Sequence, residues 1–280
     1  MFVRADKLLD ESNNQGIHII EYAWRGSEPL VSLYEQESGK ILEMKLNTMD
    51  LVLSKKKTCV GRFEGDEYRP CPEAIQVKGF SQCRKCASVW IPIQECVFEP
   101  RCRGERCDCN FCSRGHLVYV AFIGRSIKVG MTGGGRLETR GIEQGADAIV
   151  PLVECESRLD ARNMENRLAK ELGLSQRIPQ KSALKAIAAP ADKELVVRKY
   201  HEILKKTRNF CQPLEEEISF LNDYPIRRLD NAPALASTEG THRGELLGLK
   251  GKFAVYRESN GSIKALNLSD CVARRLITLD

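Results

Sequence analysis

Residues 116–132, HLVYVAFIGRSIKVGMT, constrain the fold of this chain more than any other stretch. Residues 117–123 are apolar at almost every position and rich in β-branched and aromatic side chains, which predicts a strand buried on both faces. Gly124 and Arg125 supply a two-residue turn, and residues 127–131 return with Ile, Val and Met on one face. The sequence therefore predicts a buried β-hairpin here.

The second strand of this hairpin carries an unusual pair of residues on its other face. Lys128 and Gly130 share that face, and neither suits a strand that only fills a core, because lysine is charged and glycine has no side chain to pack. We interpret this pair as the first indication of a functional site.

The cysteines predict bound metal. The chain has 12 cysteines, and nine of them lie between Cys59 and Cys112. The N-terminal segment carries Arg4, Asp6 and Lys7, so it does not resemble a secretory signal. Clustered cysteines in a chain without such a signal favour metal ligation over disulfides.

Four of these cysteines have the spacing of one zinc site, C-x11-C-x11-C-x2-C, formed by Cys59, Cys71, Cys83 and Cys86. The two residues between the last pair let both thiolates reach one tetrahedral ion at about 2.3 Å. Sites made of cysteine are usually closed and stabilise a fold, so we assign structural Zn²⁺ and no catalysis to them. An iron–sulfur cluster is the less favoured alternative.

A second group offers more ligands than one ion needs, and it consists of Cys96, Cys102, Cys107, Cys109, Cys112 and His116. We therefore expect one or two zinc ions. Ten Lys and Arg residues surround the two groups and either contact nucleic-acid phosphates or offset thiolate charge. Cys155, Cys211 and Cys271 are interpreted as buried small hydrophobic residues.

Length and charge set wide limits on function. The 280 residues favour more than one domain, and the net charge of +5 permits a nucleic-acid partner without requiring one. The longest uninterrupted apolar run, residues 117–123, is far shorter than the ~20 residues that cross a bilayer. We expect a cytoplasmic protein that does not contact membranes.

The pattern along the chain predicts an α+β fold with four parts. These are an N-terminal β-rich unit at 1–58, a cysteine-rich zinc-binding module at 59–115, an α/β domain at 116–208 and a C-terminal β-rich unit at 209–280. Residues 33–46 align without gaps to residues 255–268. The similarity is explained either by two similar β modules or by two unrelated hairpins that share a pattern.

The central part is predicted to continue from the hairpin with alternating helices and strands. A short helix at 137–144 ends at Gly145, and a strand at 148–153 contains Pro151, which predicts an edge or a bulge. Ser157 and Gly173 cap a helix at 158–172. Residues 176–192 are predicted to be an irregular linker, and 193–207 a helix.

Glu165 falls inside the apolar stripe of the 158–172 helix, which is formed by Ala161, Met164, Leu168, Ala169 and Leu172. An unpaired carboxylate there would be costly. The pattern therefore predicts that Glu165 has a partner, namely an arginine, a lysine or a metal ion. The alternative is a glutamate at the edge of the stripe that reaches solvent.

The order of elements at 116–175 resembles the GIY-YIG nuclease domain, with a small β-sheet flanked by helices. Leu117-Val118-Tyr119 and Lys128-Val129-Gly130 stand in place of its two signature triplets. The resemblance implies an active site with Glu165 as the ligand of Mg²⁺ or Mn²⁺ and a tyrosine that orients or deprotonates water. The implied residues are Tyr119, Gly130, Arg136 or Arg140, and Glu165.

Lys128 replaces the second tyrosine of the nuclease pattern, and Leu117 replaces the first glycine. Lys128 either contacts phosphate or pairs with Glu165 and takes the place of the metal. An open pocket shared by Glu165, Tyr119, Lys128 and Arg140 would favour a nuclease, whereas a closed ion pair between Lys128 and Glu165 would favour a binding protein.

The whole chain also resembles an uncharacterised prokaryotic family, domain-of-unknown-function family 2797. The segments that carry this resemblance are CVGR at 59–62, CP at 71–72, QCRKC at 82–86, His116 with VYVAF, KVG at 128–130 and RGIEQGA at 140–146.

Together these features predict a metal-dependent hydrolase of nucleic-acid phosphodiesters, acting on DNA or RNA, with structural zinc. Two alternatives remain: a catalytically inactive nucleic-acid-binding protein that uses the same fold as a docking surface, and a zinc-stabilised scaffold for a protein partner.

Overall fold

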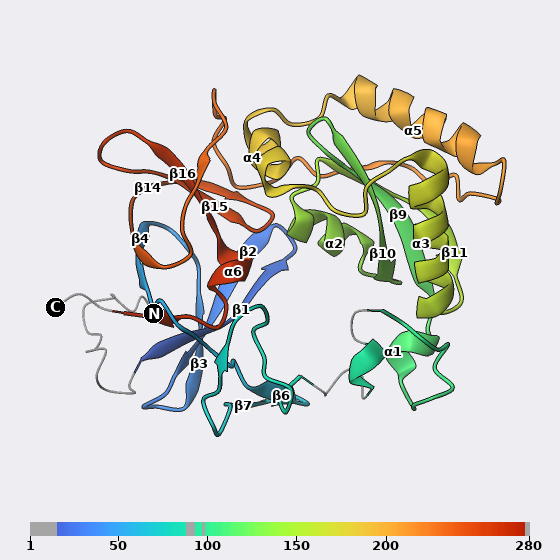
Figure 1. Ribbon diagram of the computed structural model, residues 1–280. Coiled ribbons are helices and arrows are strands. Elements are labelled where there is room, and N and C mark those ends of the chain that lie inside the picture. Colours follow the sequence, from blue (N-terminus) through green and yellow to red (C-terminus); the bar gives the residue numbers. More distant parts are fainter. Residues whose placement is uncertain (1–15, 88–92, 97–98, 278–280) are drawn as a thin grey trace. The chain divides into compact units, whose positions relative to one another are not determined.

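The computed structural model describes residues 16–87, 93–96 and 99–277, which form two compact units (Figure 1). The β unit contains residues 16–87, 225–227 and 234–277. The sheet–helix unit contains residues 93–96, 99–224 and 228–233. The fold is mixed α+β, as the sequence predicts.

The boundaries of these units differ from the four predicted parts. Strands from residues 17–53 and from residues 240–276 pair in one sheet, so the predicted terminal units form a single unit. The cysteine-rich region is divided, because its first four cysteines belong to the β unit and its last five to the sheet–helix unit. Residues 209–224 join the sheet–helix unit, where β12 extends the sheet.

The β unit consists largely of short strands. Its elements are β1 (Ile17–Arg25), β2 (Glu28–Glu35), β3 (Lys40–Met44), β4 (Met49–Leu53), β5 (Lys57–Thr58), β6 (Arg62–Glu64), β7 (Glu67–Arg69), β8 (Gln76–Val77), β13 (Ala234–Leu235), β14 (Gly240–Lys250), β15 (Phe253–Arg257), β16 (Ile263–Asn267), α6 (Leu268–Cys271) and β17 (Arg275–Leu276).

The large sheet of this unit has an internal two-fold pattern. Its strand order is β13-β16-β15-β14-β4-β17-β1-β2-β3. The first half contains the three-stranded meander β1-β2-β3 followed by β4, and the second half contains the meander β14-β15-β16 followed by β17. In each half the fourth strand pairs with a strand of the other half. Thus β4 pairs with β14, β17 pairs with β1, and β4 and β17 meet between them.

The two segments that align in the sequence occupy corresponding places in this pattern. Residues 33–46 contain the β2–β3 turn, and residues 255–268 contain the β15–β16 turn. Gly39 and Gly261, which align, both have positive φ, at 66° and 84°. Only glycine adopts this backbone conformation without steric cost, so the matched glycines serve the same turn geometry.

The sheet–helix unit contains the predicted hairpin. Its elements are the 3₁₀ helix η1 (Gln94–Cys96), α1 (Asn110–Ser113), β9 (His116–Ile123), β10 (Ser126–Gly133), α2 (Leu137–Gln144), β11 (Ala148–Cys155), α3 (Arg158–Leu172), α4 (Gln180–Ala188), α5 (Lys193–Thr207) and β12 (Ser219–Phe220). Gly124 and Arg125 form the two-residue turn, and Gly124 has a φ of 56°. The hairpin prediction is therefore confirmed.

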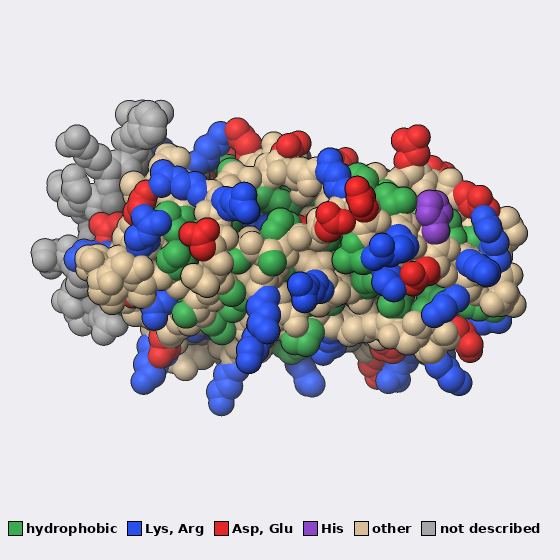
Figure 2. Space-filling model, turned by 90° about the horizontal axis from the view of Figure 1, so that it is seen from above, with side chains coloured by type: hydrophobic (Ala, Val, Ile, Leu, Met, Phe, Trp, Pro, Cys, Tyr) green, Lys and Arg blue, Asp and Glu red, His purple; other side chains and the backbone are tan. Residues whose placement is uncertain are grey.

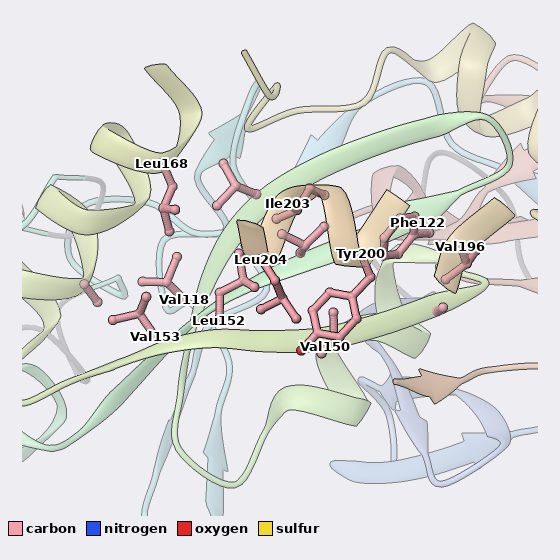
Figure 3. Close-up of a cluster of buried hydrophobic side chains, with 14 of the residues drawn as sticks. Val118, Phe122, Val150, Leu152, Val153, Leu168, Val196, Tyr200, Ile203 and Leu204 are labelled. Carbon is pink, nitrogen blue, oxygen red and sulfur yellow. The ribbon is translucent and has the colours of Figure 1, made fainter. Parts of the chain in front are cut away.

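Strand β9 is buried on both faces, as predicted. In the order β10-β9-β11-β12 it has a neighbour on each side. Val118, Val120 and Phe122 pack on one face against α3 and α5, in the cluster drawn in Figure 3. Tyr119, Ala121 and Ile123 pack on the other face with a second cluster that includes Ala146, Ile149, Ala186 and Leu221.

The caps of α3 also match the sequence prediction. The Ser157 hydroxyl accepts a hydrogen bond from the Asp160 backbone N–H, and Gly173 ends the helix with a φ of 64°. The prediction for Pro151 holds in one respect: β11 has a register shift between Pro151 and Val153, although it is an inner strand of the sheet and not an edge.

The linker prediction at 176–192 is wrong, because α4 forms there. Leu184, Ala186 and Ile187 lie on its buried side. Pro179 and Pro190 flank the segment and make it look irregular, yet the residues between them are mostly alanine, lysine, leucine and isoleucine. Such residues form helices readily when one side can be buried. None of the helices in the described part of the chain is long and apolar enough to cross a membrane.

Leu168 on α3 tests the first core cluster. It is fully buried there, and Leu168→Ala is expected to lower the free energy of unfolding by about 2–5 kcal/mol because a cavity replaces packed methyl groups. Equilibrium unfolding in urea, followed by far-ultraviolet circular dichroism, measures the change. Val197→Ala on α5, at a side chain that is 38% exposed, is the control and should change stability by less than about 0.5 kcal/mol. Equal losses in the two variants would contradict the assigned core.

Candidate metal centre and candidate active site

Four cysteines from three segments of the β unit converge on one point. Cys59 follows β5, Cys71 follows β7, and Cys83 and Cys86 lie in a single turn. Their sulfur atoms all lie within 4.8 Å of one another, which is close enough for one metal ion such as zinc. The first predicted ligand set is therefore confirmed as a cluster that could hold a metal ion.

The local backbone is shaped around these sulfurs. Gly61 has a φ of 78°, and a Cβ atom there would lie 2.2 Å from the carbonyl oxygen of Arg69, so only glycine fits. The backbone N–H groups of Gly61 and Cys83 point at the Cys59 Sγ, at 3.4 and 3.2 Å. Hydrogen bonds of this kind stabilise a thiolate, which is the form that binds metal.

Burial disfavours the charged form at two of the four sulfurs. Burial raises the pKa of Cys59 and of Cys86, although backbone N–H groups oppose the rise at Cys59. At Cys83, burial is outweighed by hydrogen bonds, above all from the Cys86 N–H, and the pKa is lowered. A bound cation would remove this penalty, and four thiolates in tetrahedral reach of one point fit Zn²⁺ well.

The second predicted ligand set is not gathered in this way. Within the described residues, the four-cysteine centre is the only place where three or more possible ligand atoms lie within 4.8 Å of one another. Cys96 and Cys102 pack with Ile93 and Phe111. The Cys107 thiol lies beside Cys109, and burial together with the charge of Cys109 raises its pKa.

An arginine contacts two members of this second set. Arg158, the first residue of α3, donates from Nη1 to the Cys96 carbonyl oxygen at 2.5 Å and lies 4.0 Å from the Cys112 Sγ. His116 is buried, with its Nδ1 2.8 Å from the Arg114 carbonyl oxygen, and its Nε2 has no hydrogen-bond partner within the described residues. Arg158 thus places a permanent positive charge beside Cys96 and Cys112.

In the sheet–helix unit, Gly130 makes room for Tyr119. The two residues are opposite each other in the β9–β10 pairing. A Cβ atom on residue 130 would lie 2.5 Å from the Tyr119 Oη and 2.6 Å from its Cζ, so the tyrosine ring occupies the space that a side chain would need. Residue 130 is therefore a glycine because the ring of Tyr119 packs in the space that a side chain would occupy.

Tyr119 is a buried residue with a fixed hydroxyl. Its side chain is 1% exposed, and Gln144 on α2 donates from Nε2 to its Oη at 2.8 Å. Burial raises the pKa of Tyr119, while the positive charge of Arg140 and the hydrogen bond from Gln144 oppose the rise. This hydroxyl is held in place and remains protonated at neutral pH.

The two candidate arginines share one carboxylate. Arg136 and Arg140 lie 2.9 and 3.1 Å from Glu143, which is on α2. Both arginines are exposed, and only Arg140 has an electrostatic interaction with Tyr119 and Lys128. Of the two alternatives left open by the sequence, Arg140 is the one adjacent to the tyrosine.

Glu165 is buried and paired, as its place in the apolar stripe predicts. Glu165 is 4% exposed, and its carboxylate accepts a hydrogen bond from Arg162 Nη1 at 2.5 Å. Arg162 also approaches Glu99 at 3.5 Å. Burial raises the pKa of Glu165, and the charges of Arg162 and Lys128 oppose that rise. The partner required by the sequence pattern is an arginine of the same helix.

Lys128 interacts with charged groups of this cluster. Its Nζ is 6.0 Å from the centre of the Tyr119 ring. Burial, reinforced by the charge of Arg140 and opposed by that of Glu165, lowers the pKa of Lys128 to about 8. Among the described residues no ion pair within 4.0 Å joins Lys128 to Glu165, so the closed pair that would favour a binding protein has not formed.

Sequence reasoning missed three members of this cluster: Gln144, Glu143 and Arg162. Helical spacing could have found them, because Gln144 is four residues after Arg140 on α2 and Arg162 is three residues before Glu165 on α3. The two-residue turn at 124–125 also fixes the register that places Gly130 opposite Tyr119.

The fold and these sites define a two-unit α+β protein with a cysteine centre suited to a metal ion. The family described as Protein of unknown function (DUF2797) matches residues 47–270, and the chain belongs to this family. No curated protein and no solved structure matched the chain. The resemblance of residues 116–175 to the GIY-YIG nuclease domain stays a prediction.

Paired substitution of two clustered cysteines tests the metal centre. Cys83→Ser with Cys86→Ser removes two ligands of one ion, so the purified protein should contain one equivalent of zinc less per chain than the parent, by elemental analysis. Cys271→Ser is the matched control, because Cys271 is a buried cysteine of the same unit outside the cluster. Loss of the same equivalent from Cys271→Ser would contradict the assignment.

Gly130→Ala tests the packing of the tyrosine. The added methyl group collides with Tyr119, and the expected loss is about 1–3 kcal/mol of unfolding free energy, measured in urea. Gly134→Ala is the control, because a Cβ atom there would meet nothing closer than 3.6 Å. In the background of Tyr119→Ala the penalty should disappear, and a penalty that persists there would show that Tyr119 is not its cause.

Proposed function

We propose that the sheet–helix unit hydrolyses nucleic-acid phosphodiester bonds with a divalent metal ion, in the manner of GIY-YIG nucleases. One observation carries this proposal. Glu165 from α3, Lys128 from β10, Tyr119 from β9 and Arg140 from α2 interact with one another in a single cluster, although they are up to 46 residues apart. These are the residue types that the nuclease chemistry needs.

In this proposal a divalent ion would be held by a single protein ligand. Glu165 offers one buried carboxylate, whose pKa is raised by burial although the charges of Arg162 and Lys128 oppose the rise. Mg²⁺ and Mn²⁺ are commonly held by one or two carboxylates, with water and substrate phosphate completing the shell. When bound, such an ion would neutralise phosphate charge and activate a water molecule.

The protein residues have separate roles in this proposal. Arg140, which is exposed and permanently charged, would bind phosphate oxygens and stabilise the charge that develops in the transition state. Lys128 would contact the phosphate beside it. Tyr119, buried and held by Gln144, would orient water through its hydroxyl, because burial raises its pKa and keeps it protonated.

The Arg162–Glu165 pair favours a second candidate function. An arginine that already neutralises Glu165 occupies the place where a cation would bind, as expected if the fold binds nucleic acid without cleaving it. Figure 2 shows Lys and Arg side chains interspersed with Asp, Glu and hydrophobic ones on one face. Binding by such a mixed surface would be weak and strongly salt-dependent.

For the β unit we propose one structural Zn²⁺ on Cys59, Cys71, Cys83 and Cys86. Support comes from their four converging sulfurs and from the N–H groups directed at Cys59. A closed thiolate site of this kind would stabilise short loops that bury little apolar surface of their own.

Cleavage assays with a variant of Glu165 test the hydrolase proposal. The purified protein is incubated with labelled single-stranded, duplex and branched DNA and RNA, with Mg²⁺ or Mn²⁺. Glu165→Gln is expected to slow cleavage about a hundredfold or more, because it removes the charge that holds the metal. Glu171→Gln is the control, since Glu171 is an exposed glutamate of the same helix.

Two results would count against hydrolysis at this site. Cleavage that is equal in the parent and in Glu165→Gln would come from elsewhere or from a contaminant. Salt-dependent binding without any cleavage would support the binding function instead.

A further inference from the structure

The β unit has a cavity of about 490 Å³ next to the four-cysteine centre, and the hydrolase cluster does not use it. Its walls come from β1, from the chain between residues 57 and 82, and from residues 269–272. The second of these segments contains Cys59 and Cys71 and ends directly before Cys83. Metal at the cysteine centre would therefore fix this wall of the cavity.

Aromatic rings supply much of the lining. Phe63 and Tyr68 lie together, with ring centres 5.3 Å apart, and pack against the buried residues Ile20 and Val60. Phe80 also lines the cavity, and it is 61% exposed although its side chain is large and apolar. A ring with this exposure has surface that another ring can contact.

The lining also contains polar and charged groups. Lys57 and Arg62 are half-buried cations, of which Arg62 pairs with Glu64, and Glu21 and Asp270 are exposed carboxylates. Gln82 holds the wall in place by donating from Nε2 to the Gly61 carbonyl oxygen at 2.7 Å. The cavity thus combines apolar ring faces with cations and hydrogen-bonding groups, which is the combination that a nucleotide requires.

We propose that this cavity binds one unpaired nucleotide of a single-stranded nucleic acid, with its base stacked on Phe80 and its phosphate beside Lys57 and Arg62. Every nucleobase has a π face, so stacking tolerates any sequence, and cations follow the backbone. A base inside a duplex is already stacked on its neighbours and cannot offer its face. The proposal goes beyond the hydrolase site, since it concerns the other compact unit and does not require Glu165.

Binding to short labelled oligonucleotides tests the proposal in the 280-residue chain, purified without chelators so that any bound metal is retained. Fluorescence anisotropy is measured without added Mg²⁺ or Mn²⁺, so that hydrolysis plays no part. Phe80→Ala should weaken binding of a single strand about tenfold, because stacking on an aromatic residue is worth that much or more. Phe80→Tyr keeps the ring and should bind like the parent.

Two further measurements separate stacking from attraction by charge. A 2-aminopurine base in the oligonucleotide should lose fluorescence on binding to the parent and lose less with Phe80→Ala. Lys57→Gln should reduce the salt dependence of binding by about one phosphate contact. Leu235→Ala controls for the loss of an exposed apolar side chain, because Leu235 is 45% exposed in the same unit outside the cavity lining.

Several outcomes would overturn the proposal. These are equal binding by the parent and Phe80→Ala, equal affinity for duplex and single strand, and unchanged 2-aminopurine fluorescence. Competition by a free mononucleotide as strong as that by the strand would assign the cavity to small nucleotides and overturn the assignment to a strand. Because none of these measurements involves cleavage, an inactive hydrolase site would leave their result unaffected.

Discussion

The pairing of the two ends of the chain determines the architecture of this protein. β4 pairs with β14, and β17 pairs with β1, so neither end can complete the large sheet alone. The intervening chain leaves the sheet after β4 and returns before β14. The sheet–helix unit therefore lies in the sequence between two strands, β4 and β14, that pair with each other.

Within the sheet–helix unit, the buried charges depend on one another. A carboxylate as buried as Glu165 is stable only with a partner, and Arg162 provides it from one turn earlier on the same helix. Lys128 and Arg140 add positive charge nearby, and Arg140 is balanced by Glu143. An incoming anion or cation would change these pairings.

Local patterns in the sequence predict local structure well. Ser157 and Gly173 mark the ends of α3, Gly124 and Arg125 mark the turn of the hairpin, and the spacing of Cys83 and Cys86 marks the metal centre. The four-part division was inferred from composition along the chain, and composition does not show which distant strands pair. The β1–β17 and β4–β14 pairings join residues that are about 200 or more apart, so the sequence pattern cannot show them.

The sequence pattern likewise predicts the candidate site only in part. Periodicity places Glu165 in the core and requires a partner, but it does not choose among Arg162, Lys128 and a metal ion, because that choice depends on side-chain geometry in three dimensions. Similarly, Lys128 and Gly130 stand out as a pair in the sequence, yet only the tertiary structure shows that the glycine accommodates Tyr119.

The exchange of β4 and β17 between the two halves of the sheet also sets an order of events during synthesis on the ribosome. All strands of the smaller sheet, β9 to β12, have been translated by residue 220, whereas the large sheet lacks β17 until residue 276 emerges. Domains fold as units as soon as their residues are available. The part of the protein encoded in the middle is therefore free to fold first, and β1 to β4, although translated earliest, wait the longest for their partners.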